Sequence, residues 1–174
     1  NDRLKNSFIT SIKVFSTFME MRGRNCAGHS RRVSDLARKI AMRLDLYSKQ
    51  LQEVFVACLL HEIGKIGFPG AMLRKPLSAM ASDELALYRR HTLNGEAALL
   101  PLGQLQRVAH IVRSHHERID GKGYPDGLSG EEVPLAAQIL SVASDYHAAQ
   151  SGRLSLKRYS AAEAHSLILG GAGT

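Results

Sequence analysis

Apolar residues recur at every third or fourth position along most of the chain, which is the spacing of one face of an α-helix. After His29, for example, Val33, Ala37 and Ile40 follow this spacing, with arginines and lysines between them. The pattern therefore predicts a helix that begins at His29. The same reasoning predicts a second helix over residues 48–63.

Further segments fit shorter helices, and Ser160-Ala161-Ala162-Glu163 has the form of a capping box that opens a last helix of about ten residues. These segments are residues 3–21, 82–90, 93–100, 103–116 and 134–150. Two stretches rich in glycine and proline, residues 64–78 and 117–130, are predicted to be irregular. No stretch shows the strict alternation of a β-strand between hairpin turns. The sequence therefore predicts an all-α fold.

The composition is that of an ordinary globular chain. With 174 residues, 44% hydrophobic and 22% charged, it fits one domain and excludes a disordered or collagen-like protein. The longest apolar run, Val54 to Leu60, is too short to span a bilayer, so we predict no membrane segment. The chain starts at Asn1 rather than methionine, and we interpret residues 1–174 as a single domain excised from a longer multidomain signalling protein.

Two cysteines, Cys26 and Cys58, are too few for a disulfide framework. We therefore expect reduced thiols and a cytoplasmic location.

Lysine and arginine outnumber aspartate and glutamate by 23 to 16, giving a formal charge of +7. A basic cluster suits an anionic ligand, although a solvated helix face is the commoner explanation. The cluster comprises Arg22, Arg24, Arg31, Arg32, Arg38, Lys39 and Arg43. Aromatic residues make up only 6% and tryptophan is absent, so stacking platforms for nucleic-acid bases are scarce and we predict no DNA binding.

Eight histidines in a helical domain suggest a metal site, because imidazole is a common ligand of transition metals. Each candidate taken alone has an ordinary structural explanation, as a polar helix end or a satisfied core residue. Together they provide five imidazoles and two carboxylates: His29, His61, Glu62, His91, His115, His116 and Asp145. Such a set suffices for two cations bridged by a carboxylate and a hydroxide, an arrangement that cleaves phosphodiesters. Lys65, in a glycine-rich turn, could present a cation to a phosphate oxygen.

Several segments, in the same order along the chain, resemble the HD-GYP domain. They are Gly28-His29-Ser30-Arg31-Arg32-Val33, Leu60-His61-Glu62-Ile63-Gly64-Lys65, Arg90-His91, His115-His116-Glu117-Arg118 with Gly123-Tyr124-Pro125, Ser144-Asp145-Tyr146, and the closing Gly171-Ala172-Gly173-Thr174. The resemblance runs from about residue 20 to the end of the chain, and its His-His-Glu-Arg to Gly-Tyr-Pro portion is the most specific part.

The resemblance implies an HD-superfamily helical bundle with an irregular Gly-Tyr-Pro loop and a two- or three-metal site, usually iron or manganese. The implied activity is hydrolysis of the bacterial second messenger cyclic di-GMP by a bridging hydroxide, to linear pGpG and, in many members, on to GMP. The implied metal ligands are His29, His61, Glu62, His91, His115, His116 and Asp145. Lys65 corresponds to the lysine that contacts phosphate beside the metals, and Tyr124 to a tyrosine that holds substrate. His110, His147 and His165 match no ligand, and we interpret them as structural.

Three departures from the family pattern bear on activity. Glu62 replaces the bridging aspartate of the His-Asp dyad, and its extra methylene is expected to lower metal affinity or rate. Asn25 stands where members with a third metal carry glutamate, which favours two metals rather than three. The resemblance implies that these two ions are iron or manganese. After Asp145 the usual Asp-x-x-Asp-Ala-Leu-Thr-Ser-Asp-Arg-Pro-Tyr-Arg is altered, so Arg153 and Lys157 only loosely represent its substrate-binding arginines.

Two functions from different classes follow. The first is a metal-dependent cyclic di-GMP phosphodiesterase, favoured by the five imidazoles. The alternative is a catalytically degenerate module that senses cyclic dinucleotides or binds other proteins, favoured by Glu62 and the altered segment. The resemblance implies diguanylate-cyclase domains as partners, contacted through Lys122-Gly123-Tyr124, and a homodimer is left open.

Overall fold

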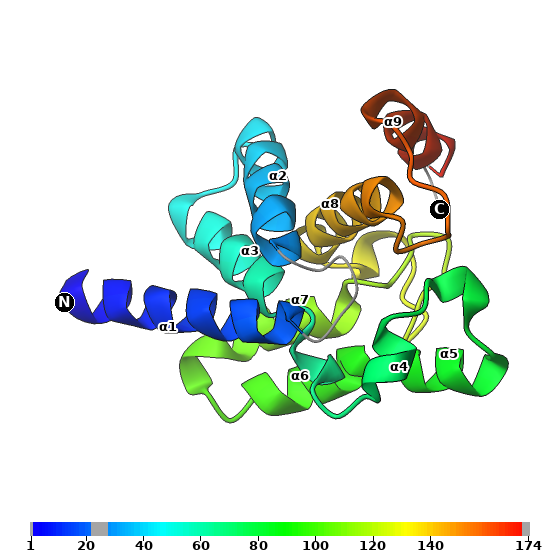
Figure 1. Cartoon of the computed structure of the whole chain (residues 1–174). Helices are drawn as coiled ribbons and strands as arrows, with labels where there is room; N and C mark the ends of the chain where they lie inside the picture. Colours follow the sequence, from blue (N-terminus) through cyan, green and yellow to red (C-terminus); the bar gives the residue numbers. More distant parts are fainter. Residues whose placement is uncertain (1, 22–27, 172–174) are drawn as a thin grey trace.

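The computed structural model describes residues 2–21 and 28–171, without the side chains of residues 2 and 4–6. Within these ranges the only β pairing is an isolated bridge between Asp120 and Ser129, so the predicted all-α fold is confirmed (Figure 1). The α-helices are α1 (Asp2–Glu20), α2 (His29–Arg43), α3 (Ser48–Leu60), α4 (Gly70–Leu73), α5 (Ser82–Arg89), α6 (His91–Leu99), α7 (Gln106–Ser114), α8 (Leu135–Ser151) and α9 (Ala161–Gly170). Short 3₁₀ turns are η1 (Ile63–Lys65), η2 (Leu77–Ala79), η3 (Gly103–Leu105) and η4 (Gly130–Glu132).

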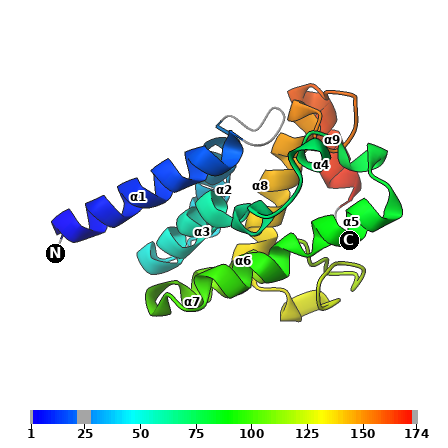
Figure 2. The same cartoon turned by 60° about the horizontal axis from the view of Figure 1, so that its bottom comes forward.

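The hydrophobic core lies where α2, α3 and α8 pack together and α7 packs on α3 and α6 (Figures 1 and 2). Its fully buried side chains include Val33 of α2, Val54 of α3, Val112 of α7 and Leu140 of α8. These positions carry the three- and four-residue spacing in the sequence, and burying each such side chain contributes roughly 1.5 to 3 kcal/mol. None of the helices in the described ranges is long and apolar enough to cross a membrane.

Four of the predicted metal-binding histidines lie at helix ends. His29 begins α2 and His91 begins α6, whereas His61 and His115 each directly follow the last residue of α3 and α7. The predicted helix over 48–63 therefore ends three residues early, at Leu60, and the predicted helix over 103–116 is shorter at both ends. The side chains of these four histidines therefore meet in one region, where the ring of His61 lies between those of His29 and His115 and the ring of His91 lies next to that of His115.

The start of α2 is fixed from a distance by α1. The Glu20 carboxylate accepts hydrogen bonds from the backbone N–H groups of Gly28 (2.5 Å) and Ser30 (2.6 Å). Free N–H groups at a helix start require such acceptors, and a carboxylate also matches the positive end of the helix dipole. α1 thereby helps to hold His29, the first residue of α2, in place.

Two glycines allow close backbone contacts beside the site. A Cβ atom on Gly64 would lie 1.9 Å from the His91 carbonyl oxygen, so only glycine lets η1 rest on α6. A Cβ atom on Gly123 would lie 2.4 Å from the Cα atom of Glu117, so the loop of residues 117–130 folds tightly back on its own beginning.

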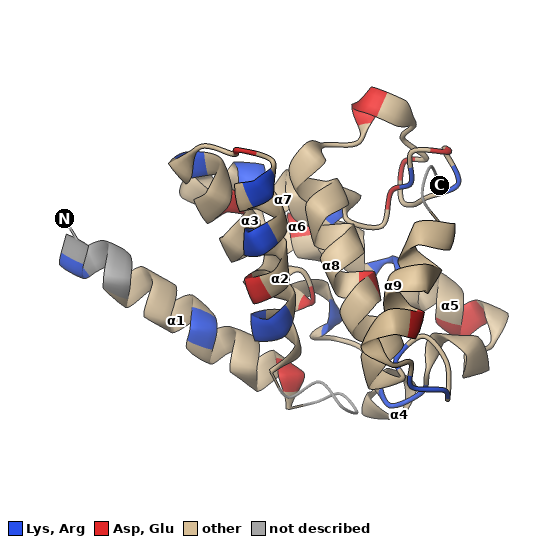
Figure 3. Cartoon of the chain, turned by 90° about the horizontal axis from the view of Figure 1, so that it is seen from above, with Lys and Arg blue, Asp and Glu red and all other residues tan. Residues whose placement is uncertain are grey.

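The segment from η1 to α5 forms a smaller apolar cluster of Phe68, Met72 and Tyr88. The predicted irregular stretch 64–78 thus contains η1, α4 and the start of η2. Basic residues recur along α2, where Arg31, Arg38, Lys39 and Arg43 are exposed (Figure 3). Arg22, Arg24, Asn25, Cys26 and residues 172–174 lie outside the described residues.

Candidate metal centre and its pocket

Two groups of side chains within the described residues could each hold a metal ion. His29, His61 and Glu62 form the first group, and His91, His115 and His116 form the second. Within each group the candidate ligand atoms all lie within 4.8 Å of one another. The groups are adjacent, because the ring centroids of His61 and His115 are 5.3 Å apart. The structure therefore brings together every predicted ligand except Asp145.

Three of these histidines are oriented by their own backbone. The Nδ1 atom of each lies at hydrogen-bond distance from the carbonyl oxygen three residues earlier: His61 from Cys58 (2.8 Å), His91 from Tyr88 (2.6 Å) and His115 from Val112 (2.6 Å). A carbonyl can only accept, so each Nδ1 carries the proton and each Nε2 presents its lone pair. Outer-shell bonds of this kind orient metal-binding imidazoles. The Nε2 atoms of His91 and His115 are 3.4 Å apart, converging on one point.

Burial keeps the imidazoles of His29, His91, His115 and His116 neutral. His29, His61, His91 and His115 are at most 1% exposed. Desolvation lowers the pKa of His115 to about 3, and it holds the pKa values of His29, His91 and His116 well below their ordinary value. A metal ion needs the neutral imidazole, so these rings are in the protonation state that binds metal.

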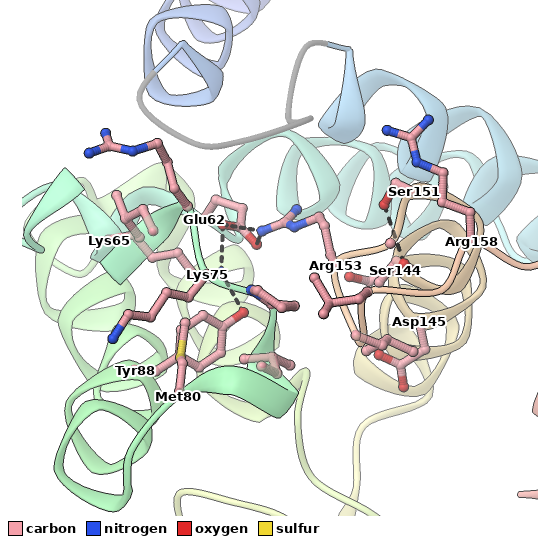
Figure 4. Close-up of a pocket in the computed structure, with 18 of the residues that line it drawn as sticks. Glu62, Lys65, Lys75, Met80, Tyr88, Ser144, Asp145, Ser151, Arg153 and Arg158 are labelled. Atoms are coloured by element: carbon pink, nitrogen blue, oxygen red, sulfur yellow. Dashed lines mark hydrogen bonds and ion pairs between the residues drawn. The ribbon is translucent and has the colours of Figure 1, made fainter. Parts of the chain in front are cut away.

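Glu62 lies at the centre of an ion-pair network at the edge of the first group (Figure 4). Its carboxylate contacts the Lys65 ammonium at 2.6 Å and the Arg153 guanidinium at 3.2 Å. Burial alone would raise the pKa of this carboxyl, but Arg153 and Lys65 outweigh burial and hold the pKa well below its ordinary value. Lys65 is 3% exposed and also donates to the Tyr88 hydroxyl at 2.7 Å. The structure thus joins the two predicted catalytic residues directly.

The structure does not bring Asp145 into either group. Asp145 lines the pocket that contains Glu62 and Lys65, but its carboxylate is directed away from Glu62 (Figure 4). Burial raises its pKa to about 6, as expected for a carboxyl with little compensation. Successive residues of a helix point about 100° apart, so residues two positions apart on α8 point in nearly opposite directions, and Asp145 therefore does not share a face with His147.

His147, interpreted from the sequence as structural, lies at the first group instead. Its Nδ1 atom is 2.7 Å from Nδ1 of His29, and its Nε2 atom accepts a hydrogen bond of 2.6 Å from Nε of Arg32. Moving the family motif one residue earlier would have indicated this. In that register Ser144 and His147 stand opposite the two aspartates, and Ala148, Ser151 and Arg153 match identical residues.

The predicted substrate-binding residues divide into two classes. Tyr124 stacks on His116, with ring centroids 4.9 Å apart and an interplanar angle of 24°, and Arg153 lines the pocket. Lys157 is exposed, and its ammonium pairs with Glu163 at 3.0 Å. In place of Lys157, the neighbouring Arg158 lines the pocket.

The structure adds two pocket residues that the motifs did not indicate. Arg74 lines the same pocket as Arg158, and within the described residues we find no ion-pair or hydrogen-bond partner for either guanidinium. Tyr88, which holds Lys65, is the second. The net positive charge of the chain was the only sequence signal for Arg74, and the sequence carried no signal for Tyr88.

Comparison with known proteins agrees with this geometry. Residues 13–174 match the family model of the HD domain, so the chain belongs to the HD domain family. It is 40% identical over 137 residues to a cyclic di-GMP phosphodiesterase of Pseudomonas aeruginosa, covering 78% of this chain and 33% of that protein. It is 31% identical over 142 residues to a 3′3′-cGAMP-specific phosphodiesterase of Vibrio cholerae, covering 82% of this chain and 31% of that protein.

Among solved structures, an HDGYP protein from Bdellovibrio bacteriovorus superimposes with a TM-score of 0.69 at 27% identity. The match covers 84% of this chain and 47% of that one. The HD-GYP resemblance drawn from the motifs is thereby confirmed. The chain spans about a third of the length of the two curated relatives.

Proposed function

We propose that this domain is a metal-dependent phosphodiesterase that hydrolyses cyclic di-GMP to linear pGpG and GMP. The observation that carries the proposal is the adjacency of the two groups of converging ligands, with Lys65 paired to the Glu62 carboxylate of the first group. The name of the Pseudomonas aeruginosa relative supports this substrate. Because cyclic di-GMP is an intracellular messenger, we further propose a cytoplasmic location.

The ligands present fit two divalent metal ions. Imidazole nitrogen with one carboxylate is a donor set that suits iron or manganese. When bound, such ions supply a nucleophilic hydroxide near neutral pH and polarise the phosphoryl oxygens. The metal ligands we propose are His29, His61, Glu62, His91, His115 and His116, and we no longer include Asp145.

The remaining steps belong to side chains of the pocket. Lys65, held by Glu62 and Tyr88, is positioned to neutralise charge on a non-bridging phosphate oxygen as the bond to the leaving 3′ oxygen breaks. Tyr124 offers an aromatic face beside His116 for a guanine base. Cyclic di-GMP carries two phosphates, and we assign the second one to Arg74 and Arg158, which line the same pocket.

One observation favours the alternative of a sensing or interaction module. Glu62 is already paired with two cations, which compete with a metal ion for its carboxylate. In that case the Gly-Tyr-Pro loop is the surface we propose for contacts with diguanylate-cyclase domains.

The test is chromatographic. The purified domain, loaded with Fe(II) or Mn(II) without oxygen, is incubated with cyclic di-GMP and separately with 3′3′-cGAMP, and linear products are followed over hours. Glu62→Asp is assayed alongside, with Glu131→Asp, an exposed position on η4, as the matched control.

Three outcomes separate the hypotheses. Turnover of cyclic di-GMP by the unmodified domain supports the proposal. Turnover by Glu62→Asp alone means that the pocket is intact and that the longer side chain silences it. If neither turns over cyclic di-GMP while metal is bound, the phosphodiesterase proposal fails in favour of the module or, where 3′3′-cGAMP is cleaved, of a different substrate.

A further inference from the structure

Three hydrogen-bonding side chains form a line that ends in the first metal group. The Arg32 Nε atom lies 2.6 Å from His147 Nε2, and His147 Nδ1 lies 2.7 Å from His29 Nδ1. On the other side of its ring, His29 Nε2 lies 3.3 Å from His61 Nε2. The chemistry of each partner fixes where the protons are.

The proton positions follow from Arg32. A guanidinium N–H can only donate, so His147 Nε2 must accept. A neutral His147 then carries its proton on Nδ1 and donates it to His29 Nδ1. A neutral His29 in turn carries its proton on Nε2.

The far end of the line is consistent with this direction. His61 uses its Nδ1 proton on the Cys58 carbonyl, so its Nε2 presents a lone pair that can accept from His29, with Glu62 Oε1 3.4 Å from the same nitrogen. Each donor in the line therefore meets an acceptor, from Arg32 through His147 and His29 to His61.

This arrangement opposes metal binding by His29. Ligation through Nε2 requires the proton to move to Nδ1, and His29 would then donate toward His147. His147 would face a donor on each side, from Arg32 and from His29, but a neutral imidazole has only one acceptor nitrogen. One of the two short hydrogen bonds must break before the first group can take up an ion.

We propose that His147 is a positioning residue that holds His29 as the Nε2–H tautomer, so that the first group, His29, His61 and Glu62, binds a divalent ion more weakly than the second. His91 and His115 of the second group have no such conflict, because the Nδ1 protons of both are committed to backbone carbonyls. The proposal rests on the metal sites assigned under the proposed function and adds an order of filling to them.

The decisive variant is His147→Asp. A carboxylate is acceptor-only and can take hydrogen bonds from Arg32 Nε–H and His29 Nδ1–H at once, which frees His29 Nε2. Changes in the outer shell of a metal site alter affinity by about 10- to 100-fold. We expect His147→Asp to tighten the weaker of two Mn(II) sites by that factor and to leave the stronger site unchanged. Titration calorimetry of metal-stripped protein measures both sites.

The same charge change elsewhere serves as control. His165→Asp, on the exposed face of α9, is expected to leave both Mn(II) affinities unchanged. If His165→Asp tightens the weaker site as much as His147→Asp does, general electrostatics explains the gain and the proposal fails.

The tautomer itself gives a readout that a packing role would not move. Long-range ¹⁵N–¹H spectra of the metal-free domain should show His29 protonated on Nε2, and in His147→Asp on Nδ1. Arg32→Met removes the donor that directs the line, so it should shift His29 in the same direction even if His147→Asp does not fold. Arg31→Met, its exposed neighbour, is the matched control.

The outcomes separate this inference from the proposed function, because no substrate is used. An Nδ1-protonated His29 in the unmodified metal-free domain would overturn it, as would equal affinities of the two sites. A domain that behaves as expected here but never hydrolyses cyclic di-GMP would retain this inference and lose the proposed activity.

Discussion

The buried pair of Glu62 and Lys65 gives a quantitative test of how the site is held together. Glu62→Gln keeps the shape of the side chain but removes its charge, which takes the anionic partner from the Lys65 ammonium, 3% exposed. The amide oxygen of the variant and the Tyr88 hydroxyl can still accept hydrogen bonds from Lys65, but neither carries a compensating charge. Removing one partner of a buried ion pair costs about 3 to 5 kcal/mol, because an uncompensated charge remains. For a chain of this size, such a loss lowers the melting temperature by about 6 to 20 °C.

The reverse change is expected to cost less. In Lys65→Met the Glu62 carboxylate keeps Arg153 at 3.2 Å, so the loss is that of one charged hydrogen bond, about 1.5 to 3 kcal/mol. In the double variant both partners of the Glu62–Lys65 pair are replaced, and replacing a whole buried pair is often close to neutral, although the partly buried Arg153 guanidinium still loses its contact with Glu62. The two effects should therefore be strongly non-additive, with the double variant more stable than Glu62→Gln alone.

Urea and thermal unfolding in the presence of EDTA, followed by circular dichroism, measure the stability of the unmodified domain, the two single variants and the double variant. Glu84→Gln, which breaks the more exposed Lys75 pair, is expected to shift the midpoint far less. If the Glu62 and Lys65 effects simply add, the two charges do not interact, and the network described around Glu62 is not what stabilises the site.

Three further predictions concern pH, packing and substrate. Because burial lowers the pKa of His115 to about 3, the unfolded chain binds more protons below about pH 6.5, and stability of the metal-free domain should fall as pH drops from there toward 3, by up to about 1.4 kcal/mol per pH unit for such a histidine. Asp145, whose raised pKa is about 6, offsets one proton of this loss between about pH 6 and 3.8, so a stability that rises steadily on acidification would contradict the assignment. Gly64→Ala should destabilise by at least about 1 to 3 kcal/mol in denaturant melts, since its Cβ would meet an α6 carbonyl at 1.9 Å, whereas Gly67→Ala, where a Cβ meets open space, should not. Arg74→Ala should raise KM for cyclic di-GMP by about tenfold, a loss of about 1.4 kcal/mol, and more than it raises KM for bis(p-nitrophenyl) phosphate; equal increases would show that Arg74 does not contact the second phosphate.

The fold could be predicted from the sequence wherever a helix buries one face. α2 and α3 have the three- and four-residue spacing because Val33 and Val54 face a common core. The helix ends at His61 and His115 could not be predicted, because apolar spacing continues past them and the ends are set by packing around the site. Gly64 shows the same limit, since the need for glycine there arises only from the approach of η1 to α6.

The residues of the site could largely be predicted from the sequence, but the direction in which each side chain points could not. Motifs predicted the histidines of both groups because their spacing is specific. Periodicity alone does not decide between Asp145 and His147, because the face that α8 presents is decided only when it packs on α2, and only the motif register that starts at Ser144 favours His147. Lys157 and Arg158 differ by one position in a segment without periodic signal, so the sequence alone gave no basis to prefer Arg158.

The distribution of ligands over the helices has a consequence for cooperativity. The first group joins α2 to the end of α3, and the second joins the start of α6 to the end of α7. An ion in one group would stabilise one pair of helices against local unfolding and would leave the other pair unstabilised, because local unfolding follows such contiguous units. Because we propose that the second group binds metal more tightly, hydrogen exchange at partial metal loading should slow in α6 and α7 before it slows in α2. The two pairs of helices would then be stabilised one after the other.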